Sequence, residues 1–540
     1  MAACVALTVW LHRRCLTAYF APDDLISLER ARGLLPPYPV PFWRVLSGSG
    51  YFAVALRVFG TNPFPYHLVN MLVHSLNVAL VFLLARHWSG RVLVATLAAG
   101  LFATSHVYAT ALIQVVGLEE LLALAFTLLA LLVFDAGRPR RVLAACGLFA
   151  MALLSKEGAL LMPLVLLLPL PPAADGRRRL AGVGALLGVS IVYVGAFVAT
   201  TGSFAVHQGE AYAARYGTNL FHSLMTYVTW VANFHDATPD LASGISLDAW
   251  RAALWIIGAM VALAAAAWRR PTLVVAGLAW FVLALAAVLP YVNHSYAFYL
   301  YPALPGVAIA IARSCDALLA WAGGRDRPAA GARARFVGPV GWLLVAGLIA
   351  SQAWASERLN IRRWETMIPG TTLAADPGIR KSELARHVVE SLAPSLRGRR
   401  TRLVFLTPPG MRTILDTRTG QILPGGDEPV PLLFLAVLDE GRALRAAYPQ
   451  VDSVAFASAW SRAFVGFDIV AANGDGFATN FGQGPAAHLG LTRGMLAAGI
   501  PLSALDDLTE AIAAYPDDAR LVRARALIEA AMRDSARRGP

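Results

Sequence analysis

Two adjacent carboxylates, Asp23 and Asp24, stand shortly after the first apolar run of the chain. At the border of an apolar segment, one carboxyl of such a pair can have a raised pKa while the other stays ionised. That combination suits a general base or a ligand for a divalent metal. The alternative is structural, because acidic residues after a proline such as Pro22 are typical of a capped helix start.

A second set of polar residues lies inside an apolar run. These residues recur every three or four positions and so share one stripe of a helix: His67, Asn70, His74 and Asn77. Polar groups in hydrocarbon must face protein or a water-filled cavity. The stripe therefore marks the interior of a helix bundle, where it either lines a ligand cavity or forms hydrogen bonds between helices.

Lys156 stands out because it and Lys381 are the only lysines in a chain that has 46 basic residues. A compact ammonium suits a point contact with a phosphate group. Its neighbour Glu157 offers the alternative, an ion pair that only fixes the turn in which both residues lie.

Further candidates are predicted at the same outer surface. His294 is the second residue of the aromatic stretch 293–302 and can donate to an anionic head group. Tyrosines such as Tyr299 also occur at membrane interfaces without any function. His106 and Glu119 form another cluster, although a loop separates them.

The elements that position these residues are membrane helices. Hydrophobic residues make up 57% of the chain and charged residues 15%, well below the roughly 25% charged of a soluble protein. We predict an α-helical polytopic membrane protein with about eleven spans. The apolar runs are 2–11, 68–85, 92–107, 121–134, 142–154, 159–170, 180–200, 252–268, 272–290, 298–312 and 337–354.

The net charge of +12 comes from arginines clustered in short loops between these runs. That is the positive-inside pattern of a bacterial-type inner-membrane protein, and it argues against a nucleic-acid partner. Alternating the spans from a cytoplasmic N-terminus places every cluster inside. The first run is shorter than the roughly 20 residues of a span, so we expect the native chain to begin earlier.

This topology gives a transmembrane domain, 1–355, with outer-face loops 16–66 and 201–250. Within it, 219–234 is predicted as an interfacial helix. The two runs on either side of 155–158 are predicted as a helical hairpin with its tip outside.

The rest of the chain is predicted to lie outside the membrane as a small α/β domain, 356–480, and a helical tail, 481–540. Short apolar strands are predicted at 403–406 and 432–437. Two helices separated by a break at 515–517 resemble one tetratricopeptide-type hairpin. A single such unit must dock on another surface to bury its apolar face.

Five segments taken together resemble the GT-C superfamily of polyprenyl-phosphate-sugar-dependent glycosyltransferases, near the protein O-mannosyltransferases and their tetratricopeptide-bearing relatives. The carboxylate pair comes first in the chain, in the loop after the first helix. It is followed by FWRVL at 42–46, FGTNPFPYHLVNMLVHSLN at 59–77, LSKEG at 154–158 and YLYPALPG at 299–306.

The resemblance implies a catalytic base in the first outer loop, carried by Asp23 or Asp24, with Asp24 preferred by a small margin. It implies that Lys156, His294 and Arg44 hold the donor phosphate, and Tyr299 joins this set. The cavity would be lined by His67, Asn70, His74, Glu157, His106 and Glu119. Departures occur where the family has His-Pro-x-His, since this chain has Ser-His-Val-Tyr at 105–108, and where Val45 replaces a proline. A divalent metal as cofactor therefore stays open.

The implied partners are a polyprenyl-phosphate sugar donor, the lipid bilayer and a protein or glycan acceptor. A single carboxylate base without a covalent intermediate predicts inversion at the sugar. A transporter is the main alternative, because buried polar groups also form relays. No internal repeat is evident, which favours the enzyme. A catalytically silent assembly protein that holds a partner through its tail is the third reading.

Overall fold

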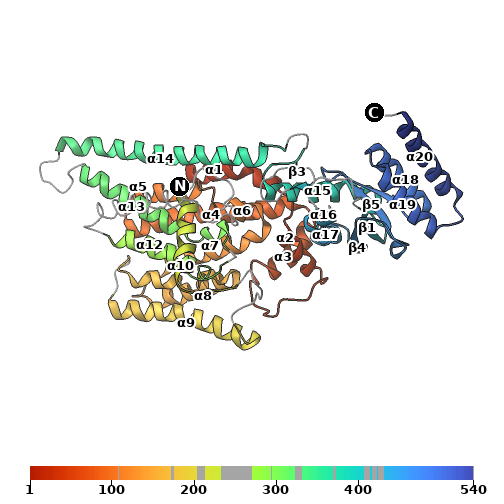
Figure 1. Ribbon diagram of the computed structural model, residues 1–540. Helices are drawn as coiled ribbons and strands as arrows, with labels where there is room; N and C mark the ends of the chain where they lie inside the picture. The colour runs from red at the N-terminus through yellow and green to blue at the C-terminus, as the bar shows by residue number, and fades with distance from the viewer. Residues whose placement is uncertain are drawn as a thin grey trace. The chain divides into compact units, whose positions relative to one another are not determined.

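Most of the predicted apolar runs are helices in the computed structural model (Figure 1). It describes residues 1–107, 109–171, 175–203, 213–232, 271–292, 295–322, 331–368, 372–406, 414–415, 422–423 and 431–538. The chain divides into two units, Met1–Thr17 with Pro36–Arg362, and Ala18–Leu35 with Arg363–Pro540.

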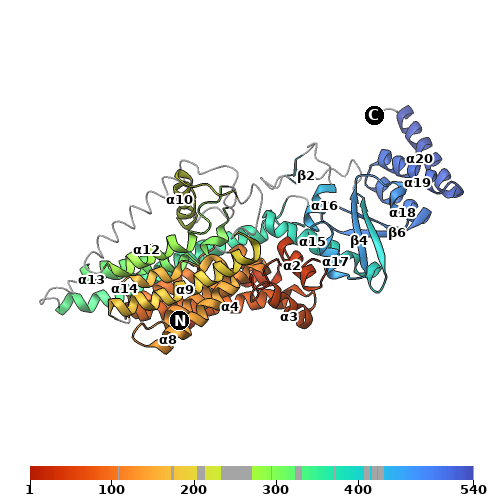
Figure 2. The same ribbon diagram turned by 90° about the horizontal axis from the view of Figure 1, so that it is seen from below.

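The first unit is a helix bundle whose helices run along a common direction (Figures 1 and 2). Its longer helices are α1 (Ala2–His12), α4 (Pro63–Ser89), α5 (Val92–Ala103), α7 (Leu118–Val133), α8 (Pro139–Ser155), α9 (Gly176–Thr201), α12 (Thr272–Leu285), α13 (Leu304–Ala322) and α14 (Gly331–Glu365). Shorter ones are α3 (Ser49–Phe59), α6 (Ala109–Ile113) and α10 (Thr218–Ala232). The last of these agrees with the predicted helix at 219–234.

Local sequence sets the ends of the long helix α4. The Asn62 side chain accepts a hydrogen bond from the backbone N–H of Phe64 at 3.1 Å, Pro63 occupies the first turn, and Gly90 closes the helix with a left-handed φ of 68°. Of the described residues, four helical stretches are long and apolar enough to cross a membrane: Pro63–Ser89, Val115–Val133, Gly176–Thr201 and Pro339–Glu365. The fold is thus that of a helical polytopic membrane protein.

Two predicted runs differ from the structure in their local form. The stretch 159–170, expected as the second arm of a helical hairpin, contains only short 3-10 helices, η3 (Glu157–Ala159) and η4 (Met162–Leu167). Pro163 and the prolines at 169, 171 and 172 prevent a continuous α-helix there. The run 298–312 begins with a 3-10 turn, η6 (Ala297–Leu300), and α13 starts only at Leu304. The predicted span 252–268 and the arginines of 325–330 lie outside the described residues.

The bundle is held by close packing of small and branched side chains. Helix α4 packs against α1, α5 and α7, and α13 packs against α12 and α5. A Cβ atom built on Gly277 of α12 would stand 2.3 Å from the carbonyl oxygen of Gly306 in α13. In lipid, such approach of two backbones replaces the hydrophobic effect as the source of helix association.

The second unit contains a four-stranded sheet with the order β4-β1-β5-β6 (Figure 2). Strand β1 (Thr401–Leu406) is parallel to β4 (Val451–Ala457) and β5 (Asp468–Ala472), and β6 (Ala478–Gly482) is antiparallel to β5. Its helices include α15 (Pro377–Leu396), α16 (Pro431–Val437), α17 (Arg442–Ala447) and α18 (Gly484–Ala497). Strands β2 (Ile414–Leu415) and β3 (Ile422–Leu423) pair separately.

The α/β character and the strand at 403–406 are confirmed, but the strand predicted at 432–437 is wrong, because this segment is helix α16. Its leucine-rich sequence after Pro431 suits a helix start better than a strand.

The C-terminal hairpin consists of α19 (Pro501–Ala514) and α20 (Ala519–Arg538), as predicted. It does not stand alone, since Leu508 and Leu521 share one apolar core with Val404 and Ile469 of the sheet. His488 of α18 also contacts Asp507 of α19 at 3.0 Å. Both helices of the hairpin pack on α18, which in turn packs on β5 and β6, so α18 is the surface on which the hairpin buries its apolar face.

Candidate functional site

The predicted acidic pair lies in the first turn of helix α2 (Pro22–Ala31), which belongs to the second unit. Asp24 is buried, and its carboxylate accepts a hydrogen bond from the backbone N–H of Ala21 at 2.8 Å. Asp23 is exposed, and its backbone carbonyl accepts a bond from Ser27 at 3.0 Å. Asp24 thus caps the helix, which leaves Asp23 as the solvent-facing carboxylate of the pair.

Helix α2 is built onto the C-terminal domain. Leu25 and Leu28 are buried, and the helix packs against α17. The backbone N–H of Tyr19, just before α2, donates to the Ser382 hydroxyl on α15 at 3.0 Å. Tyr19 and Ser382 are separated by 363 residues in the sequence. The segment that carries Asp23 is therefore held in place by a distant part of the chain.

In the first unit, the loop 42–48 is tied to the turn after α8. The Ser47 hydroxyl donates to the carbonyl of Ser155 at 2.6 Å, and the N–H of Leu46 donates to the carbonyl of Leu154 at 3.3 Å. Arg44 in this loop has a φ of 49°, which is uncommon for a residue with a side chain. These bonds hold two motif segments, 42–46 and 154–158, side by side.

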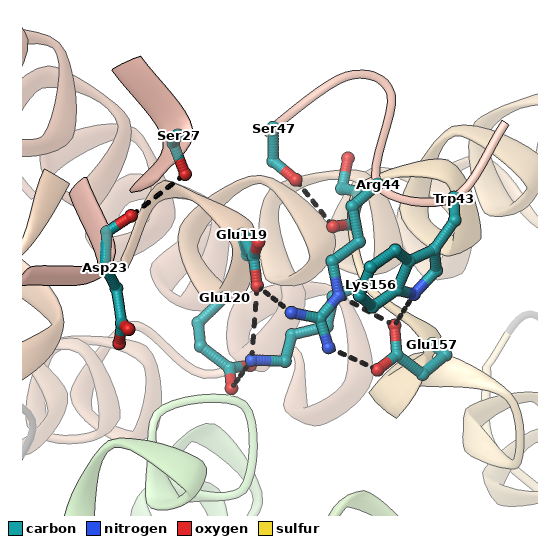
Figure 3. Close-up of polar contacts among 10 residues, drawn as sticks. Asp23, Ser27, Trp43, Arg44, Ser47, Glu119, Glu120, Lys156 and Glu157 are labelled. Atoms are coloured by element: carbon teal, nitrogen blue, oxygen red, sulfur yellow. Dashed lines mark hydrogen bonds and ion pairs between the residues drawn. The ribbon is translucent and has the colours of Figure 1, made fainter. Parts of the chain in front are cut away.

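The Arg44 guanidinium joins two carboxylates (Figure 3). Its Nε donates to Glu157 at 3.1 Å, its Nη2 contacts the other oxygen of the same carboxylate, and its Nη1 lies 2.5 Å from Glu119. The Trp43 ring covers the guanidinium at 4.6 Å, and its Nε1 donates to Glu157 at 3.3 Å. Burial lowers the pKa of Arg44, but the carboxylates of Glu119 and Glu157 raise it well above the usual value, so Arg44 stays charged.

Lys156 completes this cluster (Figure 3). Its Nζ lies 2.8 Å from Glu120 and 3.6 Å from the same Glu119 oxygen that Arg44 contacts. The rings of Phe298 and Tyr299 lie 5.5 and 5.4 Å from this ammonium, within the range of a cation–π contact. Lys156 is only 9% exposed. Its nearest carboxylate is thus Glu120, rather than the sequence neighbour Glu157 that the structural alternative had predicted.

We call these five residues the ion cluster: Arg44, Glu119, Glu120, Lys156 and Glu157. With every member ionised, its two cations face three carboxylates, a net charge of −1. Buried charges persist only when paired, because an unpaired one loses its hydration without compensation. The cluster therefore fixes the loop and the turn firmly.

The polar stripe of α4 is buried and forms bonds between helices. Asn70 donates to the carbonyl of Gln114 at 2.9 Å, and His67 contacts the carbonyl of Leu112 at 3.3 Å. Further along, His74 and Asn77 both reach the hydroxyl of one tyrosine, Tyr301, at 2.8 and 2.9 Å. These contacts favour the reading of interhelical hydrogen bonds and tie motif segment 59–77 to segment 299–306.

The positions of the other predicted residues say little about their roles. His106 is buried after α5, whereas Glu119 belongs to the ion cluster. His294 lies outside the described residues. In the part of the chain that the structure describes, no group of three or more His, Cys, Asp or Glu side chains is arranged to hold a metal ion.

Sequence reasoning missed the parts played by Glu120 and Tyr301. Glu120 directly follows Glu119 on α7, and adjacent helical residues face different directions, so the pair alone does not reveal which carboxylate meets Lys156. Tyr301 lies among tyrosines that an interfacial aromatic belt also explains. Its position in the 299–306 segment was the available signal.

The fold and the cluster define a class, a polytopic helical membrane protein with a buried ion cluster and a C-terminal α/β domain. No family model and no curated protein matches the sequence. Among solved structures, the chain is similar to the crystal structure of ArnT from Cupriavidus metallidurans bound to undecaprenyl phosphate, with 14% identity and a TM-score of 0.44. The alignment covers 91% of this chain and 94% of that chain. Similarity at this level does not define the family.

Proposed function

We propose that this protein is a membrane glycosyltransferase that moves a sugar from a polyprenyl-phosphate-linked donor to an acceptor on the extracytoplasmic face. The supporting observation is that family-like segments far apart in the sequence meet in the first unit. Arg44 of segment 42–46 contacts Glu157 of segment 154–158, and Lys156 faces Tyr299 of segment 299–306. Segment 59–77 joins them through Tyr301.

The chemistry requires a base for the acceptor hydroxyl and a cation for the departing phosphate. As the acceptor oxygen bonds to the anomeric carbon, the bond from that carbon to the phosphate oxygen breaks and its electron pair leaves with the phosphate. The hydroxyl proton passes to the base. One displacement of this kind inverts the anomeric centre.

For the base we propose Asp23, with Asp24 as the cap that orients the first turn of α2. An exposed carboxylate can reach an acceptor hydroxyl, whereas the Asp24 carboxylate is buried and already accepts the Ala21 N–H. The positive end of the α2 dipole stabilises the ionised form of a carboxylate in this turn. The Asp23 carboxylate faces solvent, from which an acceptor hydroxyl can approach it.

For the donor phosphate we propose Lys156, with Arg44 as the residue that holds the loop beside it. A phosphate oxygen can replace the Glu120 carboxylate at the ammonium because both are oxyanions. Arg44 is committed to Glu119 and Glu157, so it serves the donor by fixing the position of Lys156.

The test compares Asp23→Asn with Asp24→Asn for sugar transfer from a polyprenyl-phosphate donor, in membranes with equal amounts of protein. Asparagine keeps the size of the side chain but removes its basicity. We expect Asp23→Asn to lower kcat by about a hundred-fold to ten-thousand-fold. Asp24→Asn is the matched control and should cost only about 1 kcal/mol of stability through a weaker cap.

Full transfer by the double variant would remove this mechanism. The acidic pair would then need an explanation in terms of a transporter or an assembly protein. Wild-type membranes that transfer no sugar from any polyprenyl-phosphate donor would remove the proposed function itself.

A further inference from the structure

Helix α2 is fastened to the C-terminal domain by a buried carboxylate at the end opposite Asp23. The Glu29 side chain is 1% exposed, and its two oxygens meet Arg445 Nε at 2.8 Å and Arg442 Nε at 3.3 Å. Arg32, just past the helix, donates to the carbonyl of Arg445 at 2.9 Å. A buried carboxylate between two guanidiniums has one well-defined position, because departure from it exposes an unpaired charge to a low dielectric.

The two arginines are themselves held by an unusual turn. Asp439, Glu440 and Gly441 have φ values of 48°, 56° and 84°, three left-handed residues in succession. Arg442 donates from Nη1 to the Asp439 carboxylate at 2.9 Å and from Nη2 to the Glu440 carboxylate at 3.1 Å. A Cβ atom at Gly441 would come within 2.6 Å of Val454 on β4. The turn is thus pressed against the sheet, which makes it a rigid support.

The turn also lies within electrostatic reach of Asp23. Burial raises the pKa of the Asp439 carboxyl, Arg442 opposes this rise, and the negative charges of Glu440 and Asp23 add to it. Near one end of α2 the charge of Asp23 thus acts on Asp439 in this turn, and near the other end Glu29 contacts Arg442 and Arg445 of the helix α17 that follows the turn.

From these contacts we infer that the C-terminal domain is a positioning element for catalysis, in which Glu29, Arg442 and Arg445 hold helix α2 so that Asp23 keeps its place. The inference rests on the proposed function and assigns the domain a part in the reaction of the same site. Glu29, Arg442 and Arg445 are positioning residues and contact no substrate. Their effect is on the orientation of the base, and a displacement of about 1 Å in such a group can cost about a hundred-fold in rate.

The experiment uses the full-length protein and a double-mutant cycle of Glu29→Gln and Arg445→Gln. We expect each single change to lower kcat by about ten-fold to a hundred-fold with little change in the KM for the donor, because donor contacts are untouched. The double variant should recover much of that loss, since two amides can pair without an orphaned charge. Arg400→Gln is the matched control, because its ion pair with Asp452 in the same domain is exposed.

Hydrogen exchange separates positioning from general unfolding. In both single variants, amides of 22–31 should exchange faster while the strands β1 and β5 keep their wild-type protection. If Glu29→Gln fails to accumulate, Arg32→Met removes one bond of the same joint and should show the same pattern to a smaller degree.

Unchanged kcat in both single variants, or faster exchange throughout the sheet, would overturn the inference. A wild-type protein that transfers no sugar is a different outcome, because it removes the proposed function first. In that case, faster amide exchange confined to 22–31 in the single variants would still show that Glu29 and Arg445 hold helix α2 in place. Unchanged exchange in this helix would contradict that structural role as well.

Discussion

Lys156 has a structural role and a proposed donor-binding role, and different substitutions can test them separately. As a structural ion it neutralises Glu120 at 2.8 Å. As the proposed donor contact it binds phosphate. Removing one partner of a buried pair typically costs about 3–5 kcal/mol, whereas removing both is often close to neutral.

We therefore predict that Lys156→Met lowers both stability and donor affinity, and that adding Glu120→Gln restores stability alone. The thermal midpoint of the detergent-solubilised protein measures the first property, and the KM for the polyprenyl-phosphate donor measures the second. Arg141→Met serves as the control, because the Arg141 side chain is 48% exposed and its partner Asp135 also pairs with Arg138. Recovery of donor KM in the double variant would contradict the phosphate role of Lys156.

At the residue scale, the sequence singled out Asp23 and Asp24 by their place beside an apolar run, Lys156 by the scarcity of lysine, and Arg44 through the family resemblance. Their roles in the reaction stay predictions. Sequence reasoning preferred Asp24 to Asp23 as the base by a small margin, whereas the buried capping position of Asp24 leads us to propose Asp23. Which of them caps α2 depends on the conformation at Ala21, whose N–H the Asp24 carboxylate accepts. It also gave no sign of the partner of Glu29, which lies 416 residues away.

At the element scale, helix α4 is joined to the 299–306 segment by one hydroxyl. The Tyr301 oxygen meets His74 at 2.8 Å and Asn77 at 2.9 Å, and all three side chains are buried. Interhelical hydrogen bonds in membrane proteins average about 0.6 kcal/mol and reach about 1.7 kcal/mol.

We predict that Tyr301→Phe destabilises the solubilised protein by about 1–2 kcal/mol, because two bonds are lost at once. Tyr216→Phe is the control, since Tyr216 is 78% exposed. Equal unfolding curves for the two variants in a denaturing detergent titration would show that the stripe does not hold these elements together.

Long elements were predictable because hydrophobic length dominates them, as in α4 and α9. Short ones were not. At 432–437 the short apolar run was given more weight than the helix propensity of leucine and the helix-start signal of Pro431, so a strand was predicted where α16 lies. Likewise, the loop predicted at 16–66 contains two helices, α2 and α3. Helix α2 is short and mixed in polarity, and the apolar helix α3 is too short to be counted as a membrane span.

At the scale of the whole molecule, we predict from the arginine distribution that the tail after 356 lies outside the cytoplasmic membrane. An alkaline phosphatase reporter, which is active only after export, should be active when fused after Pro540. The same reporter inserted in the loop at 138–141, on the predicted cytoplasmic side, should be inactive. The reverse pattern would overturn the topology.

Domain organisation was only partly evident from the sequence. Composition separates the apolar part from the tail near residue 356, and the structure has a division at Arg362–Arg363. Composition could not show that residues 18–35 fold with the tail, because a short amphipathic segment between two apolar ones looks like any external loop.

The long separation between Glu29 and Arg445 has a consequence for biosynthesis. Helix α2 is among the first segments made, but its partners follow 416 residues later. At about 5–20 residues per second, the ribosome needs roughly 20–80 seconds to reach them. During that interval the side chains that are buried in the folded protein, Leu25 and Leu28, have no packing partners, and Glu29 has no arginine to pair with. A nascent chain released early would therefore contain the apolar helices, but helix α2 with the proposed base Asp23 would not be held in position. Only completed chains would become active.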